Sequence, residues 1–88
     1  MLTIYKYPLT LKVPLPKGAI VLSVTEQGEK MFVYSLVDPE VKEVEMVNFR
    51  VFGTGHEIED IEDYKFLGTV KLAGGALMFH VFYEQKEG

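Results

Sequence analysis

The sequence predicts an all-β fold: a small antiparallel sandwich or partly open barrel of about seven strands, with at most one short helical turn. Two observations predict it. Apolar and polar residues alternate with a period of two along most of the chain, and glycine or proline interrupts the alternation repeatedly. Eighty-eight residues, nearly half of them hydrophobic, suffice for one core, so we expect a single domain over residues 1–88.

The alternating segments are expected to form the strands. In chain order they are 2–7, 9–13, 19–26, 31–38, 42–52, 64–72 and 76–84. Pro8, Pro14 and Pro16 flank the second segment and restrict it to a short edge strand or an irregular strand, because proline cannot donate to a β-ladder. Gly28 and Gly74-Gly75 are typical of hairpin turns. The polar segment 56–63 is expected to be a loop with at most a single helical turn.

Two of these segments carry information in the phase of their alternation. In the third segment, the apolar residues expected to share a face are Ile20, Leu22 and Val24. In the fifth, the apolar set changes from Val44 and Met46 to Val47, Phe49 and Val51. A slip of one residue is what a β-bulge produces, so we expect a bulge there, with Arg50 and Phe52 on the same face.

Two further segments are apolar on both faces. In 31–38 this pattern predicts a buried central strand. In 76–84, Met78, His80 and Phe82 oppose Phe79, Val81 and Tyr83. That pattern indicates either a central strand or a face that packs on another subunit, and we favour the subunit interface of a symmetric homo-oligomer. We expect His80 to be a buried, hydrogen-bonded histidine.

Composition excludes several classes of function. The net charge is −4 and the lysines are scattered, without the basic stripe that binding to polymeric nucleic acid requires. There is no cysteine, so disulfides and thiolate zinc sites are excluded. No apolar run has the length of a signal-peptide core or a transmembrane helix, so we expect a soluble intracellular protein without membrane contact.

The most informative stretch for function is FRVFGTGHEIED. Arg50 can donate two hydrogen bonds to one phosphate, and Gly53 and Gly55 allow consecutive amides to converge on an oxygen. Thr54 adds a hydroxyl, and His56 adds a second cation or a stacking surface. The pattern predicts a site for a small anion. The alternative is a turn whose glycines only permit the bend, and both interpretations remain open.

A second candidate lies in the N-terminal YKY motif. Tyr5 and Tyr7 share a face on either side of Lys6, so the tyrosines can stack on bases while the lysine pairs with a phosphate. The favoured alternative is an edge strand whose tyrosines cover the core. In an oligomer, the same strand can instead contact a neighbouring subunit.

Catalytic machinery is not expected. The chain lacks a cysteine nucleophile and a Gly-x-Ser-x-Gly elbow, and a hydrolase built from His56 with Glu57 or Asp60 is the weaker alternative. The carboxylates in the polar segment 56–63 could in principle bind a divalent cation. Their spacing along the chain fits no compact calcium loop, so a solvated loop is favoured. We expect no enzyme activity, no metal and no cofactor.

Four segments together carry a family resemblance. They are IYKYPL, VPLPKGAIVLSV, FRVFGTGHEI and FLGTVKLAGGALMFHVF, and the Gly-Thr-Gly-His block and the FHVF motif are the most specific. On these segments the chain resembles a family of small uncharacterised phage-encoded proteins. That family is in turn similar to phage anti-defence sponge proteins, which form homo-oligomers and sequester cyclic nucleotide immune signals, as the anti-CBASS sponges for cyclic GMP-AMP do.

The resemblance implies a function and a place of action. It implies an immune-evasion protein that binds a small nucleotide ligand, such as a cyclic dinucleotide, without cleaving it, in the cytoplasm of the infected bacterial host. The two candidate motifs suit a phosphate and a base. Self-assembly is consistent with the segments that are apolar on both faces. The alternative is a small phage protein-binding or structural module that acts through exposed sheet edges.

Overall fold

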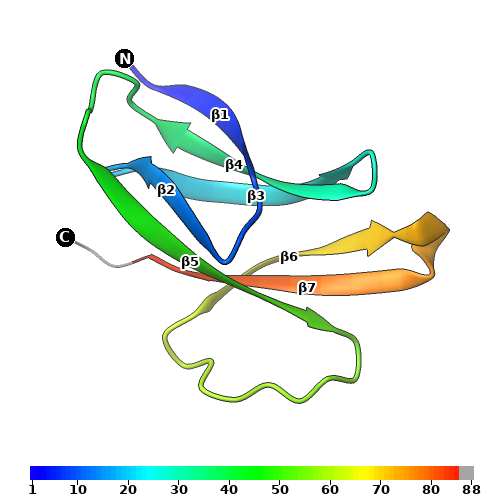
Figure 1. The fold of residues 1–88 in the computed structure, drawn as a ribbon. Coiled ribbons are helices and arrows are strands. Elements are labelled where there is room, and N and C mark those ends of the chain that lie inside the picture. Colours follow the sequence, from blue (N-terminus) through cyan, green and yellow to red (C-terminus); the bar gives the residue numbers. More distant parts are fainter. Residues whose placement is uncertain (86–88) are drawn as a thin grey trace.

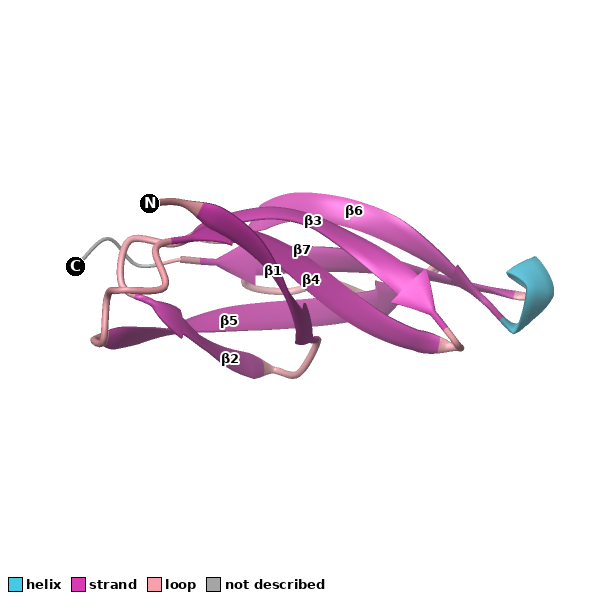
Figure 2. Ribbon diagram, turned by 90° about the horizontal axis from the view of Figure 1, so that it is seen from above, coloured by secondary structure: helices cyan, strands magenta, loops and turns pink. Residues whose placement is uncertain are grey.

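The computed structural model describes residues 1–85, which form a two-layer β-sandwich (Figures 1 and 2). One layer is a three-stranded sheet in the order β1-β4-β3, and the other is a four-stranded sheet in the order β2-β5-β7-β6. The strands are β1 (Thr3–Pro8), β2 (Lys12–Pro16), β3 (Ile20–Gln27), β4 (Lys30–Val37), β5 (Val44–Gly53), β6 (Lys65–Leu72) and β7 (Leu77–Glu84). All paired strands are antiparallel, and the sheets do not close into a barrel. The predicted all-β sandwich is confirmed.

Both expected hairpins are present. β3 and β4 are joined by the two-residue turn Gly28-Glu29, in which both residues have positive φ, the backbone geometry that suits the twist of a hairpin. Glu26 stabilises this turn, because its Oε2 accepts the amide hydrogen of Glu29 at 2.9 Å. The second hairpin joins β6 to β7 through a 3₁₀ turn, η1 (Ala73–Gly75). The one helical turn of residues 1–85 therefore lies here, and not in 56–63.

The core lies between the two sheets and consists mainly of valine. The buried apolar residues are Val13, Leu15, Ala19, Val21, Val33, Val37, Val47, Phe49, Val70 and Val81. β4 is the central strand of its sheet, as expected, although only one of its faces is buried. β7 lies between β5 and β6, so the central-strand alternative for 76–84 describes its position. Within residues 1–85, no helix has the length and apolar character needed to cross a membrane.

The predicted bulge in β5 is wrong. β5 pairs with β2 and β7 in an unbroken register, and Val44 and Met46 simply point outward, where they are 62% and 51% exposed. The alternation therefore keeps its phase, and the apolar residues at its start face solvent instead of the core. The bulges lie instead in β3, between Val21 and Ser23, and in β6, between Phe66 and Gly68.

The bulge in β3 also corrects the face predicted for that strand. One residue is inserted between Val21 and Ser23, so the side chains beyond it change sides. Val24 consequently packs against the core on the same side as Val21, whereas Ile20 and Leu22 are exposed. The expected common face of Ile20, Leu22 and Val24 is not formed.

Candidate functional site

The segment that carries the Gly-Thr-Gly motif has to cross a sheet. β5 and β6 both pair with β7 in an antiparallel sense, so they run parallel to each other on either side of it. The connection from Gly53 to Lys65 must therefore return along the length of β7 over one face of the sheet. It takes the outer face, and Figure 1 shows it as the long green-to-yellow loop on the side away from the three-stranded sheet. We call residues 54–64 the crossover loop.

Arg50 holds the crossover loop against the sheet. Its Nη1 donates to the carbonyl oxygens of Glu59, at 2.7 Å, and Asp60, at 2.9 Å. The guanidinium also lies over the rings of Phe52 and Tyr64, at 4.9 and 5.4 Å from their centroids. A planar, weakly hydrated cation suits this position between aromatic rings and carbonyl groups. The first role of Arg50 is thus to position the loop.

The charge of Arg50 is not neutralised by a carboxylate of the described chain. The ion pairs within residues 1–85 are Lys17 with Glu43 and the N-terminal amine with Asp38. A guanidinium has five N–H donors, and in the same part of the chain only Nη1 makes hydrogen bonds. The Nε and Nη2 donors of Arg50 are therefore available to an outside acceptor. They form a fixed, charged edge on the outer face of the four-stranded sheet.

The Gly-Thr-Gly corner is a closed turn. The Gly53 amide donates to Nδ1 of His56 at 3.3 Å, and the His56 amide donates back to the Gly53 carbonyl at 3.2 Å. The imidazole lies so close to Gly53 that a Cβ there would be 2.9 Å from Cε1 of His56. Gly55 has a φ of 88° and needs glycine for its conformation. In this geometry the Gly53 amide is directed into the loop, as in the simple-turn interpretation.

His80 on β7 links the crossover loop to β6. Its Nε2 lies 2.8 Å from the Thr54 hydroxyl in the crossover loop, and its Nδ1 lies 2.9 Å from the Thr69 hydroxyl on β6. The predicted hydrogen bonding of His80 is confirmed, but the residue is only half-buried. Both ring nitrogens have a hydroxyl partner, and a hydroxyl can either donate or accept. The interaction ties the beginning of the loop to β7.

An aromatic cluster that was not predicted accompanies Arg50. Phe82 lies edge-on to Phe52, with centroids 5.9 Å apart, and to Phe66, with centroids 5.3 Å apart. The register explains the cluster, because Arg50, Phe82 and Phe66 are direct neighbours across β5, β7 and β6. The register of the Gly74-Gly75 hairpin alone would have placed Leu67 opposite Phe82, and the bulge after Phe66 moves the pairing by one residue, so that Phe66 pairs with Phe82 instead. Phe66 keeps 57% of its surface exposed.

The YKY motif is not part of this arrangement. β1 is an edge strand of the other sheet, so Tyr5, Lys6 and Tyr7 are separated from Arg50 by the whole sandwich. Lys6 Nζ donates to Gln27 Oε1 at 2.5 Å and lies 4.7 Å from the ring centroid of Phe32. Tyr7 packs against the core, and its pKa is raised by burial and by the neighbouring Tyr5. The favoured interpretation of an edge strand with core-covering tyrosines matches this position.

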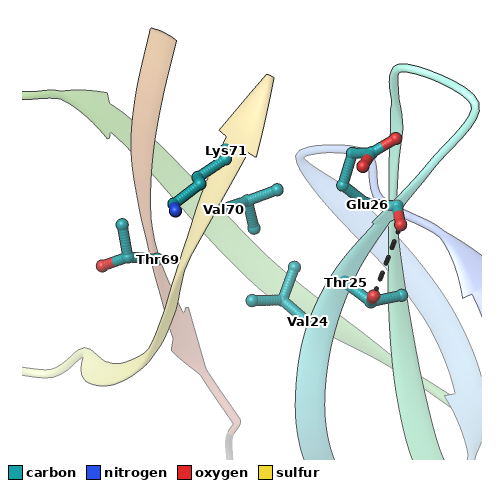
Figure 3. A pocket seen from close by; sticks show the side chains of 6 residues that line it. All are labelled: Val24, Thr25, Glu26, Thr69, Val70 and Lys71. Carbon is teal, nitrogen blue, oxygen red and sulfur yellow. Dashed lines mark hydrogen bonds between the residues drawn. The ribbon is translucent and has the colours of Figure 1, made fainter. Parts of the chain in front are cut away.

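A shallow groove of about 260 Å³ lies where the free edges of the two sheets approach each other, between β3 and β6. It is lined by Val24, Thr25, Glu26, Thr69, Val70 and Lys71, which Figure 3 shows from both strands. The edges touch at one end, where a Cβ on Gly68 would be 3.1 Å from Val24, and at the other, where the Ala73 amide donates to Glu29 at 2.9 Å. Among residues 1–85, no group of three acidic or histidine side chains is arranged to hold a metal ion.

Fold and site together define a small two-layer β-sandwich domain with a cationic and aromatic patch under its crossover loop. All 88 residues match the model of a family described as a domain of unknown function, DUF7352, and the chain belongs to this family. No curated protein and no solved structure matches the chain.

Proposed function

We propose that the protein acts by stoichiometric binding, and that it sequesters a small anionic ligand of the cyclic-nucleotide class without cleaving it. The observation that carries the proposal is the Arg50 guanidinium. It is held rigidly by Phe52, Tyr64 and two backbone carbonyls, and its Nε and Nη2 donors have no partner within the described residues. A preorganised guanidinium edge suits a phosphate oxygen pair.

Aromatic surface beside this edge supports the choice of a nucleotide over a bare anion. Phe66 is more than half exposed and adjoins Phe82, next to Arg50 in the register. A base can stack on such a ring, and stacking contributes about 1–3 kcal/mol per base. One phosphate on Arg50 of β5 and one base on Phe66 of β6 are therefore matched by groups on the two strands that flank β7, with Phe82 of β7 between them.

The remaining polar groups support binding without turnover. His80 is engaged by two threonine hydroxyls, and Nδ1 of His56 is engaged by the Gly53 amide. Ser35 is fully buried in the core, away from any substrate. From the resemblance to phage anti-defence proteins we infer that the protein acts in the cytoplasm of an infected bacterium, where removal of an immune signal would protect the phage.

The test is a calorimetric titration of the purified chain with cyclic GMP-AMP and related cyclic dinucleotides. Arg50→Lys keeps the charge but loses the planar fork, so the dissociation constant is expected to rise by roughly 10- to 100-fold. Lys6→Ala is the matched control, because it removes a cation from the opposite sheet and should leave the affinity unchanged. Nucleotide recovered after denaturation must be intact. Cleaved nucleotide, or equal affinities of the Arg50→Lys variant and the original chain, would refute the proposal.

A second candidate function is a protein-binding or structural module. The observation that favours it is the free edge of β1 on the three-stranded sheet, which can add a strand from a partner, whereas the edge of β3 faces β6. A native mass spectrum of material from infected cells distinguishes the two. One stoichiometric protein partner without bound nucleotide would favour the module.

A further inference from the structure

The outer face of the three-stranded sheet is apolar. We call this the apolar face and define it by Leu2, Ile4, Ile20, Leu22, Tyr34 and Leu36. Ile4, Leu36 and Ile20 are direct neighbours across β1, β4 and β3, so they form one continuous row. The alternate residues of β4, including Val33 and Val37, point into the core, and this leaves the row directed outward.

Nothing in residues 1–85 covers the apolar face. The crossover loop lies on the opposite side of the sandwich, where Arg50 holds it. Leu2, Ile4, Ile20 and Leu22 are 62%, 56%, 55% and 44% exposed, although they are large aliphatic side chains. A contiguous group of this size on a small domain is typical of an interaction surface and not of a solvated face.

We propose that the apolar face binds a second copy of this chain, so that two three-stranded sheets pack face to face. The four most exposed side chains together with the half-buried Tyr34 and Leu36 offer on the order of 500 Å² per protomer, and two copies then reach roughly the 1,000 Å² that a specific interface needs. The face is the same on both partners, as an isologous dimer requires.

Charge supports an antiparallel arrangement of the two copies. Lys6 borders the apolar face at one end, and Asp38, which also pairs with the N-terminal amine of its own chain, follows β4 at the other end. A two-fold axis across the strands therefore brings Lys6 of each copy toward Asp38 of the other. An anionic membrane surface is the poorer occupant, because the chain has a net charge of −4.

This inference deepens the proposed function, since it assigns the surface of the homo-oligomer. The sequence pattern had favoured β7 as the subunit interface, and the inference assigns the interface to the apolar face instead. The outer face of β7, with His80 and Phe82, is partly occupied by the crossover loop and by neighbouring aromatic rings. The dimer surface and the Arg50 site then lie on opposite sides of each protomer, and both remain accessible in the dimer.

The first experiment is sedimentation equilibrium of the full chain, which has a mass of 10.0 kDa as a monomer. The original chain is expected to behave as a dimer. Ile4→Lys combined with Ile20→Lys should raise the dimer dissociation constant by roughly 30-fold or more, because it places unpaired charges in a desolvated interface. Leu11→Lys combined with Val44→Lys is the control: it makes the same change of charge at exposed apolar positions outside the face, which are 72% and 62% exposed.

A monomer at all concentrations, or a dimer that survives the Ile4 and Ile20 substitutions, would overturn the inference. The inference would also be overturned if the Leu11→Lys/Val44→Lys control dissociated as readily as the Ile4→Lys/Ile20→Lys variant. Nucleotide titration of the Ile4→Lys/Ile20→Lys variant separates this inference from the proposed function. Dissociation with unchanged nucleotide affinity is expected, and a dimer that binds no nucleotide would refute only the proposed function.

The second experiment does not depend on the folding of charged variants. The chain has no cysteine, so Leu22→Cys introduces a single thiol into the apolar face and Leu11→Cys introduces one outside it. Maleimide labelling of Leu22→Cys is expected to slow by about tenfold or more as the protein concentration rises from below the dimer dissociation constant to far above it. Labelling of Leu11→Cys should not change. Equal labelling of both thiols at every concentration would refute the dimer surface.

Discussion

The imidazole of His56 covers Gly53 and accepts its amide hydrogen through Nδ1 at 3.3 Å. This contact turns the Gly-Thr-Gly corner into a closed turn that starts the crossover loop. It also explains why position 53 is glycine, because its backbone does not have a positive φ and the constraint is the ring above it.

Gly53→Ala is expected to lower the free energy of unfolding by about 1 kcal/mol, the contribution of the hydrogen bond that His56 loses when its ring moves aside. Urea unfolding measures the change. His56→Ala provides the control, since adding Gly53→Ala to that variant should cost almost nothing. A similar cost in both backgrounds would show that the imidazole contact is not the cause.

Arg50→Met is expected to release the crossover loop from the sheet. It removes two hydrogen bonds to carbonyl oxygens while keeping an apolar side chain between the rings, and should lower the free energy of unfolding by about 1–3 kcal/mol. Hydrogen exchange should accelerate in residues 57–64 and remain unchanged in β3 and β4. Uniformly faster exchange throughout the chain would argue against a local clamp.

Ser35→Ala is expected to stabilise the protein by about 1 kcal/mol. The Ser35 hydroxyl is fully buried and has no hydrogen-bond partner among the described residues, so it is desolvated without compensation. Urea unfolding tests this, with the exposed Ser23→Ala as a control that should be nearly neutral. A destabilised Ser35→Ala variant would mean that the hydroxyl has a partner in solution, such as a bound water.

Tyr7 is expected to make stability fall at alkaline pH. Its pKa lies above the ordinary value of 10.0 because of burial and then the neighbouring Tyr5. The folded chain thus holds the phenolic proton more tightly than the unfolded chain does, and stability is lost as the pH rises above 10.0 through the folded-state pKa. Urea midpoints measured across this range should fall less for Tyr7→Phe. Parallel curves for the two proteins would contradict the expectation.

Local signals in the sequence were sufficient for the hairpins and for six of the seven strands. The second strand was expected at 9–13, but it lies at Lys12–Pro16, and as an edge strand it accommodates Pro14 and Pro16. Gly28 and Gly74-Gly75 each lie between alternating segments, and turn chemistry of this kind depends on neighbouring residues only. The bulges were not predictable in the same way. The phase change at Val44 and Met46 resembled a bulge, whereas the bulge after Val21 left no signature, because an apolar residue can face either solvent or the core.

Residue chemistry identified Arg50 and the Gly-Thr-Gly-His corner as the interesting region, but it did not show what each group contacts. The partners of Arg50 are two backbone carbonyls, and backbone carbonyls leave no mark in a sequence. The aromatic neighbours Phe66 and Phe82 are distant along the chain and meet Arg50 only through strand pairing. The YKY motif had suitable chemistry as well, but it lies on the other sheet.

The sequence by itself determined the all-β fold and the approximate places of six of its seven strands, because periodicity and turn chemistry act over a few residues. Only the tertiary structure decided that the loop after Gly53 crosses the outer face of one sheet and that the outer face of the other stays bare. The physical reason is the strand order: placing β7 between β5 and β6 forces a crossover on that side, and no connection is required on the side of β1, β4 and β3.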